Sequence, residues 1–489
     1  MKSLTYTIIE HQSFGIDEIA TALQCTQTKA KKLFEALEDF AKGKNNEGFL
    51  RYYGKTHLKA QNYVGVIQTK HGTLEILPKC FREEQIQTNT NQENPTNREK
   101  LKQDKKINKD ELKEFFALKN FENQLCEEPP KIKDFKLFDT SKKSAQNFLL
   151  FCLKAFKKEL FKSSNLSSLS TTYTPLLEIF MKMFCQELLE VCKKGIRHDY
   201  VAIEDNRTFL KGKLLFSGQI RHNLVHKERF YTSSDEYIAD IAPNRLIKST
   251  LELISTLSTS HITQTLINQC LEVFEEIPSS GNIEGDFLSC TSSRHFGYYD
   301  NLLKWCELFL KNKSFTAFSG ENQAYALLFP MEKLFESYVA YMFKQGNKDI
   351  SIKAQSSSRY LLHTQGSPLF QLKPDLLFEL KGKNKKTIIA DTKWKVLKNT
   401  EDKKHGISQA DLYQLFAYAH YHNASEVWLI YPKLYEQSDK KEREIEKIIK
   451  KLSEWNAQPH YYCHPCAFEE GKKHHKIEVK IFFAPLAFH

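Results

Sequence analysis

The chain has 489 residues, too many for one hydrophobic core, so about two to four domains are expected. Hydrophobic residues make up 41% of the sequence, which excludes a largely disordered protein, and 71 Lys and Arg against 60 Asp and Glu leave a modest net charge of +11. Such a basic excess favours a polyphosphate partner only weakly. The opening MKSLTYTIIEHQ lacks a secretory signal, the eleven cysteines are odd in number, and no apolar run reaches the roughly 18 residues of a membrane span. We therefore expect a cytoplasmic protein with reduced thiols and no membrane association.

The N-terminal part of the chain predicts a mixed α/β domain. Apolar spacing predicts amphipathic helices at residues 17–24 and 27–42. Their outline resembles a helix-turn-helix, although two packed helices without a DNA role are the commoner arrangement. Alternating segments at 63–67 and 74–77 predict a hairpin, since turn-forming residues separate them. The first domain, residues 1–82, is therefore expected to combine a helical pair with a small sheet.

The centre of the chain contains two regions of opposite character. Residues 83–135 are expected to be a polar, low-complexity insertion or linker, because their few large apolar side chains cannot offset the entropy of ordering. Residues 136–320 are expected to form a mainly helical middle domain, because apolar residues recur there at i, i+3, i+4 and i+7. Such stripes indicate a scaffold rather than a cofactor site. The three helical segments span residues 144–161, 174–194 and 243–258.

The last section, residues 321–489, changes to the period of a β-sheet. Residues 373–380 and 387–397 flank a basic turn and predict an antiparallel hairpin. Residues that face each other across such a hairpin have a constant index sum, so Asp375 is expected approximately opposite Asp391. Two carboxylates therefore converge at one end of the hairpin.

Lys393 adds an ammonium group to this pair, because it follows Asp391 by two residues and emerges on the same face of the strand. A divalent cation between the two carboxylates would keep both ionised, and Mg²⁺ binds through one or two carboxylates plus substrate phosphates. The cation would polarise the scissile phosphate, while Lys393 would orient the attacking water or neutralise developing charge. A similar set on an arbitrary hairpin is more often a surface salt bridge. The order of the neighbouring elements favours the catalytic interpretation.

The elements around the hairpin are expected in the order helix, strands, helix, strand. The first helix carries Glu332 and Glu336 one turn apart, and the second carries Gln414 and Tyr418 at the same spacing. The expected helices span residues 331–343 and 408–422, and the further strands span 350–354, 359–363 and 427–431.

These residues carry a resemblance to PD-(D/E)xK nucleases. Pro374-Asp375, fifteen residues and then Asp391-Thr392-Lys393 form a PD-x15-DxK motif, and Gln414-x-x-x-Tyr418 matches the QxxxY helix of RecB-like nucleases. The resemblance implies a restriction-endonuclease-like α/β domain with a central mixed sheet that hydrolyses phosphodiester bonds with Mg²⁺; whether Mn²⁺ can replace it is left open. The implied metal ligands are Asp375, Asp391, the backbone carbonyl of Thr392 and a glutamate of the first helix. Glu336 is the better match for that glutamate, and Glu332 remains the alternative.

The chain as a whole resembles the McrC family, the nuclease subunits of McrBC modification-dependent restriction systems. The matching segments are 62–67, 74–79 (LEILPK), 209–214 (FLKGKL), 244–246, 331–339 and 391–395 (DTKWK). The resemblance implies a multi-domain α+β protein whose N-terminal part docks on an McrB-like AAA+ GTPase ring that recognises methylated DNA. The chain would stimulate GTP hydrolysis and cut DNA carrying 5-methylcytosine, in defence against foreign DNA. It contains no GxxxxGK[ST] phosphate loop, in agreement with hydrolysis by a partner.

Two alternatives and one further motif stay open. The chain could be a stand-alone RecB-like DNA repair nuclease, or a non-catalytic adaptor that activates an AAA+ motor. Near its end, two cysteines and two histidines have the spacing of a zinc site, but unrelated cysteines are the favoured interpretation. The four residues are Cys463, Cys466, His474 and His475.

Overall fold

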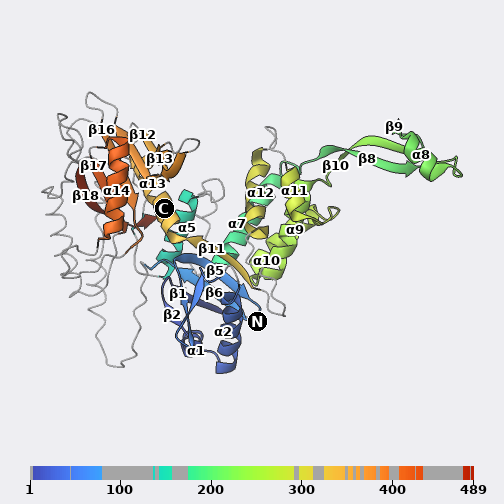
Figure 1. Cartoon of the computed structure of the whole chain (residues 1–489). Helices are drawn as coiled ribbons and strands as arrows, with labels where there is room; N and C mark the ends of the chain where they lie inside the picture. Colours follow the sequence, from blue (N-terminus) through green and yellow to red (C-terminus); the bar gives the residue numbers. More distant parts are fainter. Residues whose placement is uncertain are drawn as a thin grey trace.

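A computed structural model of the chain describes residues 4–43, 46–79, 136–137, 142–156, 174–290, 297–311, 324–346, 351–355, 359–363, 368–380, 386–395, 407–424, 426–432, 477–484 and 486–488. The four zinc candidates, residues 381–385 of the turn in the predicted hairpin and the whole of the expected insertion at 83–135 lie outside these residues. The described part is a mixed α/β protein with several separate sheets (Figure 1). None of its helices has the length and apolar character needed to cross a membrane.

The N-terminal unit is built on a four-stranded sheet in the order β1-β6-β5-β11. β1 runs parallel to β6, whereas β5 is antiparallel to both β6 and β11. The hairpin and the two helices expected from sequence are confirmed. β11 belongs to this sheet although it lies some 250 residues further along the chain and leads directly into the next helix. The elements are β1 (Thr5–Ile9), α1 (Ile16–Leu23), α2 (Gln27–Ala41), β5 (Tyr63–Thr69), β6 (Gly72–Leu77) and β11 (Tyr325–Pro330), with a small second sheet of β2 (Ser13–Phe14), β3 (Leu50–Tyr53) and β4 (His57–Ala60).

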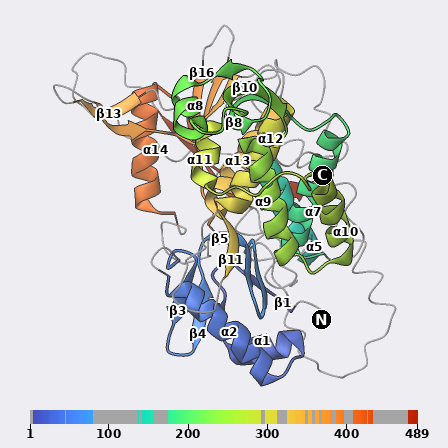
Figure 2. The ribbon, with the colours of Figure 1, turned by 90° about the vertical axis from the view of Figure 1, so that its right-hand side faces the viewer.

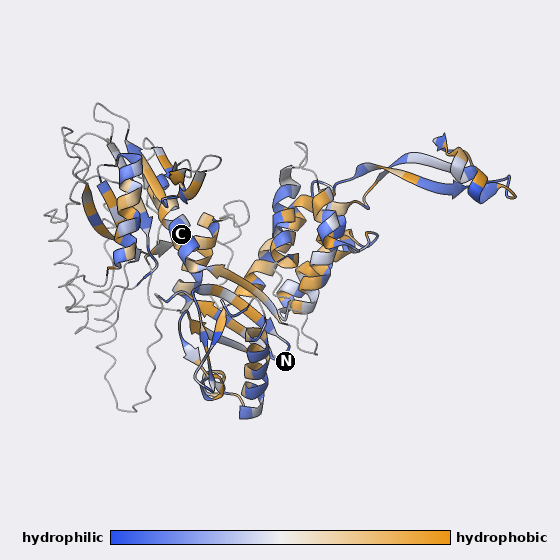
Figure 3. Ribbon diagram, viewed as in Figure 1, coloured by the Kyte–Doolittle hydropathy of each residue, from blue (hydrophilic) through white to orange (hydrophobic). Residues whose placement is uncertain are grey.

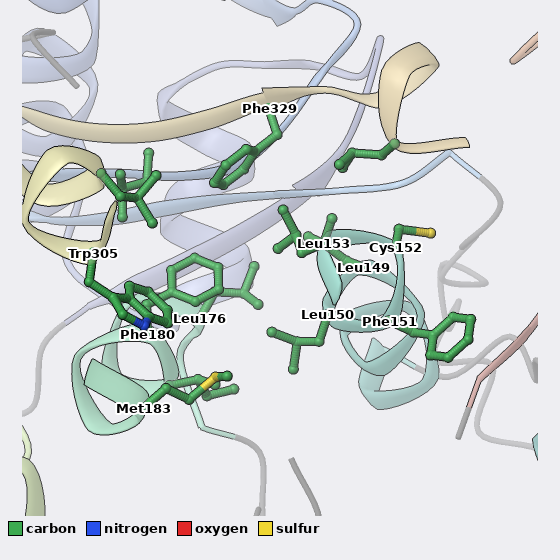
Figure 4. Packing of buried hydrophobic residues seen from close by; sticks show 14 of the residues in the cluster. Leu149, Leu150, Phe151, Cys152, Leu153, Leu176, Phe180, Met183, Trp305 and Phe329 are labelled. Atoms are coloured by element: carbon green, nitrogen blue, oxygen red, sulfur yellow. The ribbon is translucent and has the colours of Figure 1, made fainter. Parts of the chain in front are cut away.

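The middle of the chain is a helical bundle, as expected. Its amphipathic helices share one core, in which the Phe180 ring lies 6.4 Å from the Phe329 ring of β11 (Figure 4). In the same core the Phe184 ring lies 5.8 Å from the Phe309 ring. The bundle therefore packs against the N-terminal sheet. Its helices are α7 (Leu176–Cys192), α9 (Ala242–Leu257), α10 (His261–Val273), α11 (Ile283–Ser289) and α12 (Gly297–Leu310), whereas α5 (Lys142–Phe156) lies apart from them and packs its Phe148 and Phe151 rings on Tyr338 (Figure 1).

An arm projects from this bundle, and the expectation of a mainly helical scaffold did not include it (Figures 1 and 2). The long strands β8 (Asp199–Arg207) and β10 (Phe230–Ile238) pair antiparallel along their whole lengths, and β9 (Lys213–Leu214) and α8 (Phe216–Asn223) form the tip. Most residues of β8 are exposed, so the strand lacks the apolar alternation by which half-buried strands are recognised. Hydrophobic and hydrophilic side chains are mixed along the arm (Figure 3).

The C-terminal unit is a five-stranded mixed sheet in the order β12-β15-β16-β17-β18, covered on opposite faces by α13 and α14. β12, β15 and β16 are antiparallel neighbours, and β16, β17 and β18 are parallel. Phe343 of α13 contacts Phe378 and Trp428 on one face, whereas Leu415 of α14 packs with Ile389 on the other. The elements are α13 (Met331–Gly346), β12 (Ser351–Ala354), β15 (Leu376–Leu380), β16 (Lys386–Thr392), α14 (Gln409–His422), β17 (Glu426–Pro432) and β18 (Glu478–Ala484).

Three details of this unit differ from expectation. β16 ends at Thr392 rather than at 397, and the strand expected from 373 begins at Leu376, after Pro374, which has no amide donor. β13 (Arg359–His363) does not join the central sheet; it pairs with β14 (Pro368–Leu372), which was not predicted, as a separate hairpin. A short pair, β7 (Lys136–Leu137) with β19 (Ala487–Phe488), completes the described strands.

Candidate active site

The β15–β16 hairpin brings the two aspartates of the motif together. Leu376 pairs with Ala390, and the same register carried one residue further sets Asp375 opposite Asp391. Asp391 is also paired with Leu429 of the parallel strand β17, so it lies at the junction between the antiparallel and parallel halves of the sheet. Asp391 is the last but one residue of β16, and the carboxyl ends of strands are where open α/β sheets commonly bind ligands.

Asp375 is held through one of its two carboxylate oxygens. The amide and the hydroxyl of Thr392 both donate to Oδ2, at 2.7 and 2.8 Å. Burial raises the pKa of Asp375, and the two hydrogen bonds from Thr392 oppose that effect. No described residue donates to Oδ1, which leaves this oxygen free to serve as a ligand.

Asp391 and Lys393 form a close ion pair with little exposure. The Lys393 ammonium lies 2.5 Å from Oδ2 of Asp391. The lysine side chain is 18% exposed and the aspartate side chain 2% exposed. Burial and the charge of Asp375 raise the pKa of Asp391 to about 6, although Lys393 lowers it. Burial lowers the pKa of Lys393, but the charges of nearby aspartates outweigh burial and raise it. The site therefore holds more negative charge than one lysine neutralises.

Helix α14 supplies the residues that orient Lys393. Gln414 Oε1 accepts a hydrogen bond from the Lys393 ammonium at 3.3 Å, and Gln414 Nε2 donates to the Tyr418 hydroxyl at 2.8 Å. The Tyr418 hydroxyl in turn donates to the carbonyl of Lys373 at 3.3 Å. The QxxxY pair thus links the lysine to the segment just before Asp375, which fixes the two halves of the motif relative to each other.

Asp411 and Lys395 also belong to the site, although sequence reasoning did not assign them a role. Asp411 Oδ1 lies 3.8 Å from the Lys393 ammonium, and its Oδ2 accepts from the Lys395 ammonium at 2.9 Å. The spacing of both residues in the sequence could have identified them. Asp411 is one turn before Gln414, and Lys395 is two residues beyond Lys393.

The two candidate glutamates of α13 have different surroundings. Burial and the charges of Asp375 and Asp391 raise the pKa of Glu336 to about 7, although a side-chain hydrogen bond with Gln355 lowers it. The Glu336 carboxylate is therefore partly desolvated and close enough to both aspartates to be affected by their charges. Glu332 is exposed, and its Oε1 accepts from Asn62 Nδ2 of the N-terminal unit at 3.2 Å. Its charge also raises the pKa of Asp375. Both glutamates therefore act electrostatically on the aspartate pair, Glu336 from a half-buried position and Glu332 from an exposed position at which it also binds Asn62.

The donor set suits a hard cation that needs few protein ligands. Across the described ranges, no three His, Cys, Asp or Glu side chains form a closed metal-binding group, so a site built only from side chains is not preformed there. Two neighbouring carboxylates, the buried Asp391 and the half-buried Asp375, nevertheless have raised pKa values, and a cation bound between them would offset their repulsion. Mg²⁺ accepts such an arrangement, because it retains several waters and takes substrate phosphates as ligands. Asp375, Asp391 and a neighbouring carbonyl would hold it.

Comparisons with known proteins agree with this architecture. The family model described as "McrBC 5-methylcytosine restriction system component" matches residues 58–432. A chain of the structure titled "Refined half-complex from tetradecameric assembly of Thermococcus gammatolerans McrB AAA+ hexamers with bound McrC" shares 18% identity, with a TM-score of 0.57 over 98% of this chain and 95% of that one. A cryo-EM structure of the Thermococcus gammatolerans McrBC complex also matches at 18% identity, with a TM-score of 0.42 over 68% of this chain and 85% of that one. No curated protein sequence matches the chain.

The family match spans β5, the helical bundle, the arm and the candidate active site through β17. The protein is therefore a component of a restriction system and takes part in defence against foreign DNA. It belongs to the McrBC 5-methylcytosine restriction system component family.

Proposed function

We propose that this protein is the McrC-type subunit of an McrBC complex and that its C-terminal unit is a PD-(D/E)xK endonuclease. One observation carries the proposal: Asp375, Asp391 and Lys393 converge at the end of a mixed sheet covered by a helix on each face. Placing a buried and a half-buried carboxylate beside one lysine is unfavourable unless a ligand uses their charge. A magnesium ion bound to a DNA phosphate is such a ligand.

Each residue of the site has a chemical role in this proposal. Asp375 and Asp391 would hold Mg²⁺ with the Thr392 carbonyl, and Glu336 would bind the ion or one of its waters. When bound, the ion supplies charge stabilisation and a more acidic water. Lys393, oriented by Gln414 and Tyr418, would donate to the attacking water or to the phosphate oxygens as charge develops.

The partner proposed for the arm is an AAA+ GTPase ring. Phe216, Ile220 and Leu224 recur at i, i+4 and i+8 of the α8 segment and are 73%, 65% and 72% exposed. An apolar stripe on a projecting element is unfavourable in water and is typical of a docking surface. Because the similar assembly contains McrB AAA+ hexamers with bound McrC, we propose that this stripe contacts the McrB-like ring. The N-terminal unit remains a second candidate contact.

The proposal is tested by substituting one carboxylate. Asp391→Asn in the complete complex should abolish cleavage of methylated DNA in Mg²⁺ but leave GTP hydrolysis by the partner unchanged. Glu379→Gln is the matched control, because it removes an exposed carboxylate from the opposite end of the same hairpin, where Glu379 pairs with Lys353 at 2.8 Å. Undiminished cleavage by Asp391→Asn would overturn the nuclease assignment. If the wild-type complex stimulates GTP hydrolysis but does not cleave DNA, the protein is an adaptor. If the chain cleaves DNA at the full rate without the partner, it is a stand-alone nuclease.

A further inference from the structure

One end of the N-terminal sheet forms part of the surroundings of the candidate active site. β1, β6 and β11 run in the same direction, so their carboxyl ends lie together at one edge of that sheet. Glu10 follows β1, Lys79 lies two residues beyond β6, and β11 continues into α13. The sheet edge therefore faces both α13 and the segment that follows Thr392.

Glu10 and Lys79, at this edge, bind Trp394, the residue that follows Lys393. The indole Nε1 of Trp394 donates to Glu10 Oε1 at 2.6 Å, and the same oxygen accepts from the Lys79 amide at 3.0 Å. The Lys79 ammonium donates to the backbone carbonyl of Trp394 at 2.5 Å and lies 5.4 Å from the centre of its ring. Side chain and backbone of Trp394 are thus both held by residues more than 300 positions earlier in the sequence.

These contacts limit the movement of the Lys393 backbone, because they fix Trp394, the next residue in the chain. The Lys393 amide itself donates to the carbonyl of Ile430 on β17 at 2.8 Å. β16 has ended at Thr392, so beyond Lys393 the sheet no longer fixes the backbone. The Trp394 ring also packs 5.1 Å from Phe335, the neighbour of Glu336. The peptide between Lys393 and Trp394 is consequently held between the nuclease-like sheet and the N-terminal sheet.

A buried Trp–Glu hydrogen bond can have a purely structural role, and the described residues contain two others, Trp305 with Glu187 and Trp428 with Glu426. Trp305 Nε1 on α12 donates to Glu187 on α7 at 3.0 Å inside the helical bundle. Glu10 differs because its partner Lys79 also donates to the backbone carbonyl of Trp394. Burying such a polar group is costly, and here it fixes the backbone immediately after Lys393.

We propose that Glu10 and Lys79 are positioning residues for Lys393, so that the N-terminal sheet completes the nuclease site through Trp394. This inference rests on the proposed function for the catalytic role of Lys393, but not for the contacts themselves. Positioning errors of about 1 Å can reduce turnover by about 100-fold without changing substrate binding.

The test uses the full chain with two independent measurements. Acylation of Lys393 by an amine-reactive reagent, followed by mass spectrometry of the chain alone, reports how firmly the lysine is held; cleavage of methylated DNA by the complete complex reports turnover. Lys79→Met and Trp394→Phe should each raise Lys393 acylation several-fold and lower kcat by about 10- to 100-fold with unchanged KM. Glu10→Gln keeps an acceptor for the indole, so Lys393 acylation and kcat should both stay close to their wild-type values. Trp305→Phe is the matched control and should change neither.

The outcomes separate this inference from the proposed function. A folded Lys79→Met or Trp394→Phe protein with wild-type acylation, or with wild-type kcat, overturns the positioning role. If one variant fails to fold, the other decides. Should Asp391→Asn cleave DNA normally, the nuclease assignment fails, and the acylation measurement alone then decides whether the N-terminal sheet holds Lys393.

Discussion

Thr392 uses both its amide and its hydroxyl to bind the same oxygen of Asp375, at 2.7 and 2.8 Å. This double donation crosses the hairpin from the strand that carries Asp391. It stabilises the ionised form of Asp375 and leaves the other carboxylate oxygen without a hydrogen bond from any described residue. The residue between the two charged positions of the DxK motif is therefore a structural participant.

Thr392→Val should weaken metal binding. Valine keeps the shape of the side chain but removes one donor to Asp375, and a hydrogen bond to a charged group contributes about 1.5–3 kcal/mol. We expect the affinity for Mg²⁺, measured by calorimetry, to fall about tenfold or more. Thr392→Ser retains the hydroxyl and serves as the control. Equal Mg²⁺ affinities for the two variants would contradict this role of the hydroxyl.

Metal binding should weaken as the pH falls. Burial and the charge of Asp375 raise the pKa of Asp391 to about 6 in the metal-free protein. Because a cation binds the ionised carboxylate, protons compete with it below that value, and affinity should fall about tenfold per pH unit there. Between about pH 7 and pH 8 this group should contribute little pH dependence. Calorimetric titration of Mg²⁺ across this range, with Asp391→Asn as reference, checks the slope; a pH-independent affinity down to about pH 5 would contradict it.

The two glutamates of α13 should differ in their effect on cleavage. Glu336 is partly buried against Asp375 and Asp391, whereas Glu332 is exposed and bound by Asn62. We expect Glu336→Gln to lower cleavage by about 10- to 100-fold, as for residues that support a metal site, and Glu332→Gln to lower it much less. The measurement is the Mg²⁺-dependent cleavage rate of each variant, which should be lower for Glu336→Gln than for Glu332→Gln. A reversed order would assign the metal-site role to Glu332.

The candidate site was predictable because it is local. Asp375, Asp391 and Lys393 belong to one hairpin, whose register follows from pairing alone. Glu10 and Lys79 were not predictable, because no local periodicity relates them to Trp394 across more than 300 residues. A choice between Glu332 and Glu336 depends on the environment of each side chain, which their spacing of one helical turn does not reveal.

The fold was predictable to a similar extent. Amphipathic helices and alternating strands bury one face and leave a periodic signal, so the helical bundle and the N-terminal hairpin were expected correctly. β8 is exposed along most of its length and carries no such signal. β11 pairs with β5 from a distant part of the sequence, so its membership of the N-terminal sheet could not be inferred from either segment alone.

Gly65→Ala should disrupt the pairing that connects the N-terminal sheet to α13. Gly65 has a φ of +135°, and an added Cβ would lie 2.0 Å from the carbonyl oxygen of Leu327 on β11. Strain and overpacking together should lower the free energy of unfolding by about 2–5 kcal/mol. Denaturant unfolding measures this change. Gly48→Ala is the control, because no atom lies within 4 Å of a Cβ added there; equal stabilities of the two variants would contradict the close approach of β5 and β11 at Gly65.

Ile220→Asp should reduce the stimulation of GTP hydrolysis without changing the stability of the protein. Ile220 is 65% exposed at the centre of the apolar stripe on α8, so its replacement removes almost no packing within the chain. A charge placed in a docking surface is desolvated on binding, and central apolar contacts in interfaces commonly contribute more than 1 kcal/mol, or about fivefold or more in affinity. We expect reduced binding to the partner ring and reduced stimulation of GTP hydrolysis, with an unchanged melting temperature. Ile262→Asp provides the matched control, because Ile262 is 69% exposed on α10, outside the arm. Equal stimulation by both variants would exclude the α8 stripe from the partner interface.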